Sequence, residues 1–273
     1  VPGRTGFAHL FEHLMFQRSE NLKGDYLNTL QELGATDLNG TTFFDRTNYF
    51  QTVPKNALDT VLWLESDRMG HFRNAITQPI LDEQRGVVQN EKRQGDNQPY
   101  GKVFEEILKQ LFPPDHPYSW ETIGSMADLN AASLEDVRKW FDTYYGPGNA
   151  VLVVAGDVSA EEVFAKAEKY FGDIPPGPPL ARFEEWIPSH DRIRRKVMED
   201  RVAQPRLYLS WTGPRWGTRD AYHLELASAI LAGEKNSRLY QRLVYQDQLA
   251  SGVEFGALAL EIAGLTYLQV SAN

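Results

Sequence analysis

The stretch GFAHLFEHLMFQR, residues 6–18, has apolar residues at helical spacing and no internal helix breaker, which predicts a helix. Its apolar positions are Ala8, Leu10, Phe11, Leu14 and Phe16. They lie on almost every side of the helix, which is typical of a buried one. Buried histidine and glutamate side chains need polar partners, so the polar residues of this helix indicate a site.

Three polar residues of this helix have the spacing of a metal site. His9 and His13 are four residues apart and Glu12 is three residues after His9, so all three project from one helical face. This H-x-x-E-H order reverses the H-E-x-x-H zinc helix and is a signature of zinc peptidases. The two imidazoles would bind zinc at about 2.0–2.1 Å, and Glu12 would lie beside the bound water as a general base.

A chance match to this motif has odds of roughly 1% at this His and Glu content, so the motif alone does not exclude an ordinary polar helix face. A catalytic zinc typically has three protein ligands and an open water position. Glu83 and Glu91, on a helix predicted over 79–94, are candidates for the third ligand. The pattern does not choose between them.

The composition limits the partners and the metal ligands. A net charge of -9 without a Lys/Arg-rich stripe argues against nucleic acid or an anionic membrane as the main partner. The apolar runs, such as 150–155 and 227–232, are too short to cross a bilayer. Because the chain has no cysteine, a metal could be held only by His and carboxylate ligands.

Glycine, proline and other turn residues divide the rest of the chain into predicted helices and strands. Helices are further predicted over 25–33, 57–72, 102–111, 133–145, 160–171, 219–231 and 236–246. Strands are predicted in a 36–53 hairpin with Asn39-Gly40 at its turn, and over 151–155, 193–199, 205–211, 252–260 and 264–272. The segment IPPGPP, residues 174–179, is the clearest linker. We therefore predict one domain over 1–180 and a second over 190–273.

Three motifs carry a resemblance to a known family. They are GRTGFAHLFEHLMF (3–16), NGTT (39–42) leading to TNY (47–49), and VVQNEKR (87–93). With them the chain resembles the pitrilysin/insulinase (M16) family of zinc peptidases, which includes the mitochondrial processing peptidases. The match covers nearly the whole chain, and the first motif is highly specific.

The resemblance implies an α+β fold of the processing-peptidase type. It consists of two related two-layer α/β domains, each with a mixed or antiparallel sheet covered by helices. Against the family pattern, the chain lacks the opening strands of the first domain and has an incomplete second domain, so we expect a fragment. In the family two such halves close around a peptide, and the other half or a partner subunit would complete the chamber.

The resemblance also assigns individual residues. Residues 84–91 fit the family frame E-R-x-x-V-x-x-E, which makes Glu91 the third zinc ligand, while the first Glu of the frame is Gln84 here. Glu83 is one helical step away, rotated by about 100°, and does not simply replace it. The strand at Asn39, Gly40 and Thr41 would lie beside the zinc and pair with an extended substrate. Without the resemblance, Asn39-Gly40 is simply a good turn dipeptide.

The leading hypothesis is a zinc endopeptidase that binds one Zn²⁺ per site and acts on peptides or unfolded protein. The alternative is a non-catalytic homologous scaffold or binding subunit of a peptidase complex, since fold does not fix function. The complete set of His9, Glu12, His13 and Glu91 weighs against the alternative. A closed regulatory zinc site would need a fourth protein ligand, and there is no cysteine to provide one. Bacterial members of the family suggest a periplasmic or secreted location.

Overall fold

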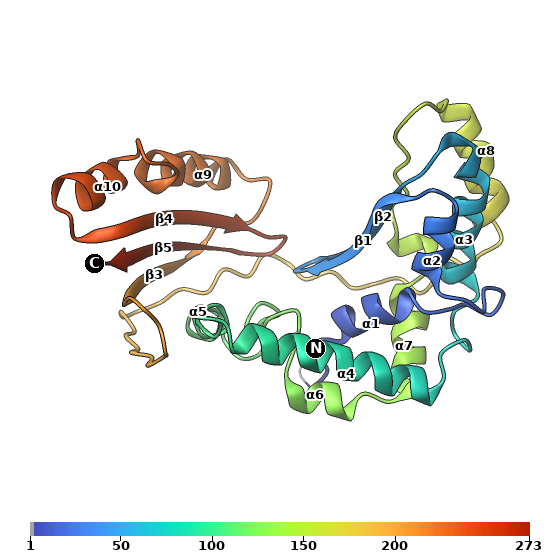
Figure 1. The fold of residues 1–273 in the computed structure, drawn as a ribbon, viewed down its shortest axis with the longest axis horizontal. Coiled ribbons are helices and arrows are strands. Elements are labelled where there is room, and N and C mark those ends of the chain that lie inside the picture. Colours follow the sequence, from blue (N-terminus) through green and yellow to red (C-terminus); the bar gives the residue numbers. More distant parts are fainter. Residues whose placement is uncertain (1–2) are drawn as a thin grey trace. The chain divides into compact units, whose positions relative to one another are not determined.

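The computed structural model describes residues 3–273, which pack into two compact units (Figure 1). Unit 1 extends to Lys92 and resumes over Thr122–Ala181, and unit 2 comprises Arg93–Glu121 and Arg182–Asn273. Both units combine helices with small antiparallel sheets, so the predicted α+β class is confirmed.

Unit 1 consists of helices and one hairpin. Its elements are α1 (Phe7–Met15), α2 (Tyr26–Glu32), β1 (Thr36–Phe43), β2 (Arg46–Thr52), α3 (Leu58–Gly70), α4 (Gln78–Asp96), α6 (Met126–Ala131), α7 (Leu134–Tyr144) and α8 (Ala160–Phe171), where α4 continues past the unit's end at Lys92. Short 3-10 turns lie at Lys55–Ala57 and Pro147–Asn149. Except for the short helix α6, which was not predicted, these helices agree with the predicted ranges to within a few residues, because amphipathic periodicity and caps are local signals. Ser133 and Asp136, for example, form the capping box that starts α7.

Helix α1 is the central element of the main core of unit 1. Leu10, Phe11 and Leu14 are almost completely buried, and the Phe11 ring packs 5.3 Å from that of Phe72. The helix starts at Gly6, whose positive φ and contact with the Ile123 carbonyl leave no room for a Cβ. This packing fixes one side of α1 and leaves His9 and His13 on its partly exposed side.

The hairpin differs from the prediction in the position of its turn. The turn lies at Phe44 and Asp45, and Asp45 has a φ of 66°. Asn39 and Gly40 lie inside β1, where Gly40 pairs with Tyr49 of β2. The predicted turn was therefore wrong, because the dipeptide's local preference is overridden by a tertiary contact that needs a glycine in the strand.

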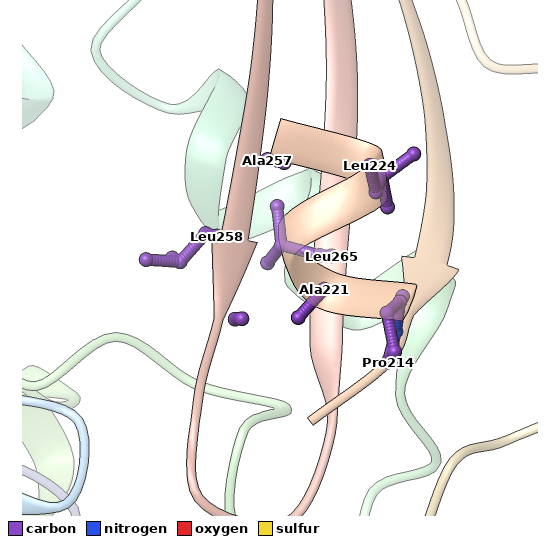
Figure 2. A pocket seen from close by; sticks show the side chains of 8 residues that line it. Pro214, Ala221, Leu224, Ala257, Leu258 and Leu265 are labelled. Atoms are coloured by element: carbon purple, nitrogen blue, oxygen red, sulfur yellow. The ribbon is translucent and has the colours of Figure 1, made fainter. Parts of the chain in front are cut away.

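Unit 2 has a three-stranded antiparallel sheet in the order β3-β5-β4. Its elements are α5 (Val103–Leu111), β3 (Arg206–Gly213), α9 (Arg219–Ala232), α10 (Arg238–Tyr240) with a π-helical turn Gln241–Gln246, β4 (Ala250–Ala259) and β5 (Gly264–Ala272). Figure 2 shows Ala221 and Leu224 of α9 beside Leu265 of the sheet, around a small apolar cavity. This part of unit 2 is a packing interface without polar side chains that could do chemistry.

Two predicted strands are absent from the sheets of the described residues. Residues 151–155 and 193–199 have no strand partner, and the side chains of Val151 and Val197 are 88% and 91% exposed. Both strand predictions were therefore wrong for the residues that the structure describes. A short apolar run becomes a strand only when another strand completes its hydrogen bonds, and the run itself does not contain that partner.

Residues 93–121 pack with unit 2, so the compact units differ from the predicted division at 180/190 in this segment. His116 Nε2 lies 2.9 Å from the Trp186 carbonyl, and the Ile262 amide donates to the Tyr118 hydroxyl at 3.3 Å. Among residues 3–273, no helix has both the length and the apolar character that crossing a membrane requires.

His116 is a buried histidine whose tautomer is fixed by two hydrogen bonds. The Tyr118 amide donates to Nδ1 at 3.0 Å, so Nε2 carries the proton and donates to Trp186. Burial lowers the pKa of His116 below its usual value of 6.5. The neutral form is thus favoured in the folded state. Its contribution to stability is complete above about pH 6.5 and is lost as the pH falls from there through the lower folded-state pKa.

We expect the free energy of unfolding of unit 2 to fall between pH 7 and pH 5, and part of this fall to disappear in His116→Gln. Each unit of pKa difference corresponds to about 1.4 kcal/mol. Urea unfolding followed by tryptophan fluorescence measures the effect, because the Trp186 ring lies 4.5 Å from that of His116. Exposed His223→Gln is the control and should keep the full pH dependence. An unchanged pH dependence in His116→Gln would contradict this account.

Candidate metal centre

The candidate centre starts with the histidines of α1. His9 and His13 are one turn apart, and their rings meet edge to face with centroids 4.8 Å apart. Both side chains are mostly buried but remain accessible from one side. The apolar residues on the rest of α1 anchor the helix in the core, so the two imidazoles have little freedom to move apart.

Helix α4 supplies the third side chain. Leu81, Gln84 and Val88 are its buried residues in this region, and Glu91 follows at the same helical spacing, so all four share one face. Glu91 Oε2 lies 3.6 Å from His9 Nε2 and 3.5 Å from His13 Nε2. Glu83 is exposed on another side of α4 and is not part of the cluster. The structure therefore favours Glu91 where the sequence pattern left both glutamates open.

The donor atoms of His9, His13 and Glu91 fit a divalent metal. They lie within 4.8 Å of one another, and no other such group of three occurs within residues 3–273. Tetrahedral zinc with donors at about 2.0–2.1 Å requires donor separations of about 3.4 Å. The Glu91 oxygen is close to that distance from both imidazoles and too far for a hydrogen bond to either. Glu91 is thus spaced from both histidines as ligands are around an ion, and the three donors lie close enough together for small side-chain shifts to bring them to one metal.

The protonation state of His9 also suits a metal ligand. Burial and then the neighbouring His13 lower the pKa of His9, while Glu12 and Glu91 act in the opposite direction. The imidazole is therefore neutral at pH 7 and presents a lone pair, which metal binding requires. Its Nδ1 is buried without a hydrogen-bond partner within residues 3–273, so packing alone orients this ring.

Glu12 has an environment different from that of Glu91. It is only 7% exposed, and its Oε2 accepts a hydrogen bond of 2.5 Å from Thr42 Oγ1 on β1. The Thr42 Oγ1 atom also lies 3.1 Å from Oγ1 of Thr47 on β2. The hairpin thus orients a carboxylate that α1 carries beside the histidines. Thr42 was not singled out from the sequence, and its position in the stretch 39–42 was the one available signal.

The predicted substrate contacts lie on β1, beside Glu12. Gly40 is buried, whereas Asn39 is exposed and its Oδ1 accepts from the Gly40 amide at 2.9 Å. The Thr41 hydroxyl donates a hydrogen bond to Asn48 Oδ1 and accepts one of 2.7 Å from Arg46. Within the described residues β1 pairs with β2 alone, so its other edge has no strand neighbour.

Comparisons with known proteins assign this chain to a family. The family model "Insulinase (Peptidase family M16)" matches residues 2–119, and "Peptidase M16 inactive domain" matches residues 131–273. The second match alone covers more than half of the chain. The chain belongs to peptidase family M16, and the predicted resemblance is confirmed.

Individual relatives agree with this assignment. The chain is 31% identical to the zinc protease PqqE of Helicobacter pylori, over 91% of this chain and 56% of that protein. It is 23% identical to the mitochondrial-processing peptidase subunit beta of Saccharomyces cerevisiae, over 84% of this chain and 49% of the relative. The chain thus spans about half the length of these curated relatives.

Solved structures match the whole chain. A protease from Helicobacter pylori superposes with a TM-score of 0.90 at 30% identity, covering 100% of this chain and 66% of that one. A peptidase M16 inactive domain from Pseudomonas fluorescens superposes with a TM-score of 0.88 at 20% identity, again covering 100% and 66%. At that lower identity the second match concerns the fold alone.

Replacing Gly40 by alanine should separate β1 from α1. A Cβ at Gly40 would lie 2.9 Å from two ring carbons of Phe16 and 3.1 Å from Glu12 Cγ. We expect a loss of about 1–3 kcal/mol in the free energy of unfolding, as for other overpacked sites. Gly86→Ala on α4 is the matched control, because no atom lies within 4 Å of its added Cβ. Equal urea midpoints for the two variants would rule out a tight contact at Gly40.

Proposed function

We propose that this chain is the zinc-binding part of a metalloendopeptidase that hydrolyses extended or unfolded peptides. The observation that carries the proposal is the close grouping of the His9, His13 and Glu91 donors, with Glu12 on the same helix face and oriented by β1. The names of the H. pylori relative and of the family model that matches residues 2–119 support the class of enzyme.

His9, His13 and Glu91 hold the zinc in this proposal. When bound, zinc polarises the scissile carbonyl and lowers the pKa of its water to about 7. Glu12 accepts a proton from the attacking water and delivers it to the departing amine nitrogen. Thr42 keeps the Glu12 carboxylate aimed at the site by donating to Oε2.

The substrate binds as an added strand along the open edge of β1. Backbone hydrogen bonds at Asn39, Gly40 and Thr41 would hold any extended peptide with little dependence on its side chains. Strand addition also explains why the substrate has to be unfolded, since a folded segment already uses its backbone groups. We further propose that the rest of the protein or a partner subunit closes the chamber, because the chain spans about half of its curated relatives.

A non-catalytic role is the second candidate, and the match of residues 131–273 to an inactive domain favours it for that part of the chain. Within those residues the structure holds no group of three possible metal ligands. The candidate centre lies before residue 92 instead, in the part that matches the Insulinase model. We therefore assign catalysis to this first part.

Glu12→Gln should leave zinc bound but reduce peptide hydrolysis by at least about 100-fold, because it removes a base without removing a ligand. The test uses the complete gene product, a quenched extended peptide and zinc analysis of each preparation. Hydrolysis that a chelator abolishes in the parent protein establishes the metal requirement. Near-normal turnover in Glu12→Gln would exclude the proposed role of this residue.

Glu91→Gln should lose zinc, since it removes one of three protein ligands and the charge that complements the ion. Glu83→Gln is the matched control, because it changes the same residue type on the exposed side of the same helix. We expect one zinc per chain in the control and a substoichiometric amount in Glu91→Gln, measured after dialysis against a weak chelator. Loss of zinc from Glu83→Gln alone would reverse the ligand assignment.

A further inference from the structure

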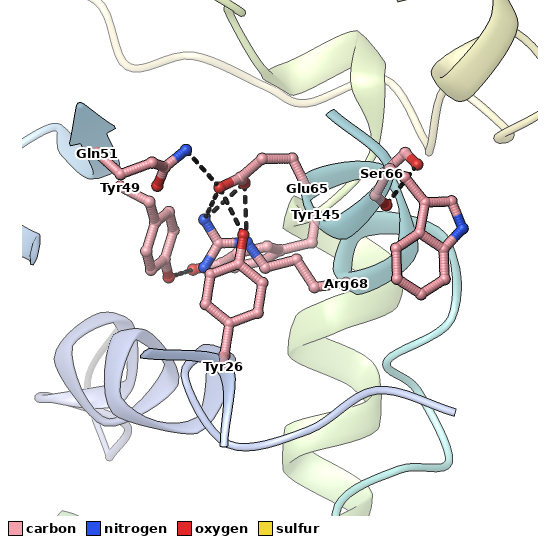
Figure 3. Close-up of polar contacts among 8 residues, drawn as sticks. Tyr26, Tyr49, Gln51, Glu65, Ser66, Arg68 and Tyr145 are labelled. Carbon is pink, nitrogen blue, oxygen red and sulfur yellow. Dashed lines mark hydrogen bonds and ion pairs between the residues drawn. The ribbon is translucent and has the colours of Figure 1, made fainter. Parts of the chain in front are cut away.

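Behind the hairpin, unit 1 contains a buried arginine. Arg68 of α3 is 3% exposed, and its guanidinium carbon lies 4.3 Å from the ring centroid of Tyr49 and 4.4 Å from that of Tyr26 (Figure 3). Contacts of this kind between a cation and aromatic rings are favourable, and more so away from water. Arg68 thus connects α3 to β2 and α2.

One carboxylate compensates the charge of Arg68. The Nε and Nη2 atoms donate to Glu65 at 2.5–2.8 Å, and the Tyr26 hydroxyl and Gln51 amide donate to the same carboxylate. Burial would lower the pKa of Arg68, but Glu65 and the two tyrosines raise it above its usual value. The arginine stays charged, and Glu65 has four groups that hold it in place.

Tyr49 connects this cluster to the candidate centre. Its backbone pairs with Gly40, and its ring meets the Phe16 ring edge to face at 5.5 Å. Phe16 is the residue that a Cβ at Gly40 would touch. The Tyr49 hydroxyl lies 2.9 Å from that of Tyr145, and burial raises the pKa of both, to about 12 for Tyr145, so this pair is neutral. The position of Tyr49 thus determines where Gly40 and β1 lie against α1.

The three metal donors belong to residues outside the Arg68 cluster. His9 and His13 belong to α1 and Glu91 to α4. Arg68 makes its close contacts with the hairpin, α2 and α3, and it approaches α1 at its C-cap, where the Phe16 ring centroid lies 5.8 Å from the guanidinium carbon. A change at Arg68 should therefore move β1 relative to Glu12 and leave the three donors in place. The site has two supports that can be altered separately.

We propose that Arg68 is a positioning residue for the peptidase reaction, acting through Tyr49 to set the position of β1 and Thr42 against Glu12. The inference rests on the function proposed above. An apolar side chain could fill the same space, and replacing a buried ion pair by apolar groups is often neutral for stability. An apolar side chain could not bind the Glu65 carboxylate. The flat guanidinium binds it and contacts two tyrosine rings at the same time.

The test compares three variants of the complete gene product. Arg68→Lys keeps the charge but loses the planar fork, and Arg68→Met combined with Glu65→Gln removes the pair without leaving a buried charge. Arg73→Met is the matched control, because Arg73 pairs with Asp142 at a half-exposed site of the same unit. Zinc content, kcat and KM are measured for each, with kcat expressed per bound zinc.

We expect normal zinc content in all three variants. In the double variant kcat per bound zinc should fall about 10- to 100-fold, since small misplacements of reacting groups have effects of this size. Arg68→Lys should recover part of this loss, and the control should match the parent protein. A purely structural role would lower the folded fraction without changing KM or the kcat per bound zinc. That result, or loss of zinc from the double variant, would overturn the inference.

A second measurement keeps this inference separate from the proposed function. Backbone amide exchange, followed by mass spectrometry, should become faster over residues 36–52 in the double variant and stay unchanged in α1 and α4. This readout does not require hydrolysis. If the parent protein cleaves no peptide, the proposed function fails. Unchanged exchange over 36–52 would then still decide against Arg68 as the support of the hairpin.

Discussion

The close contact between α1 and β1 at Gly40 is the constraint on which the candidate centre depends. The Gly40 backbone packs directly on the Phe16 ring and on the Glu12 side chain, with no space for even a methyl group. This approach brings Thr42 within hydrogen-bond distance of Glu12. A single glycine therefore allows the helix that carries the histidines and the strand that orients the carboxylate to share one site.

The parts of the fold that follow local rules could be predicted from the sequence. Helix α1 and the shared face of His9, Glu12 and His13 follow from a 3.6-residue period and need no knowledge of the rest of the chain. The turn at Asn39-Gly40 and the strands at 151–155 and 193–199 were predicted wrongly for the opposite reason. Gly40 lies inside a strand because the Phe16 ring leaves no room for a side chain there. A segment forms a strand only when a second strand pairs with it. In both cases the deciding atoms lie elsewhere in the sequence.

The remaining site residues show the same limit. The spacing alone left Glu83 and Glu91 open, and Glu91 was assigned through the family resemblance. In the structure, the burial of Leu81 and Val88 identifies the face of α4 that turns toward the histidines. Nothing local distinguishes Arg68 from the other arginines. Its importance comes from Tyr26 and Tyr49, which lie on two other elements and meet Arg68 only in the folded chain, together with Glu65 one turn earlier on the same helix.

Two glutamates occupy one small site, and their surroundings differ in the way that their two proposed roles require. Glu91 is 42% exposed and has both imidazole nitrogens near one oxygen, so its lone pairs are directed at the point where a cation would sit. Glu12 is buried, and a hydrogen bond from the hairpin restricts its rotation. A metal ligand can be partly exposed, because the ion itself fixes it. A proton-transferring group has no such anchor, so the protein has to hold it, and here that support comes from Thr42, Gly40 and the strand behind them.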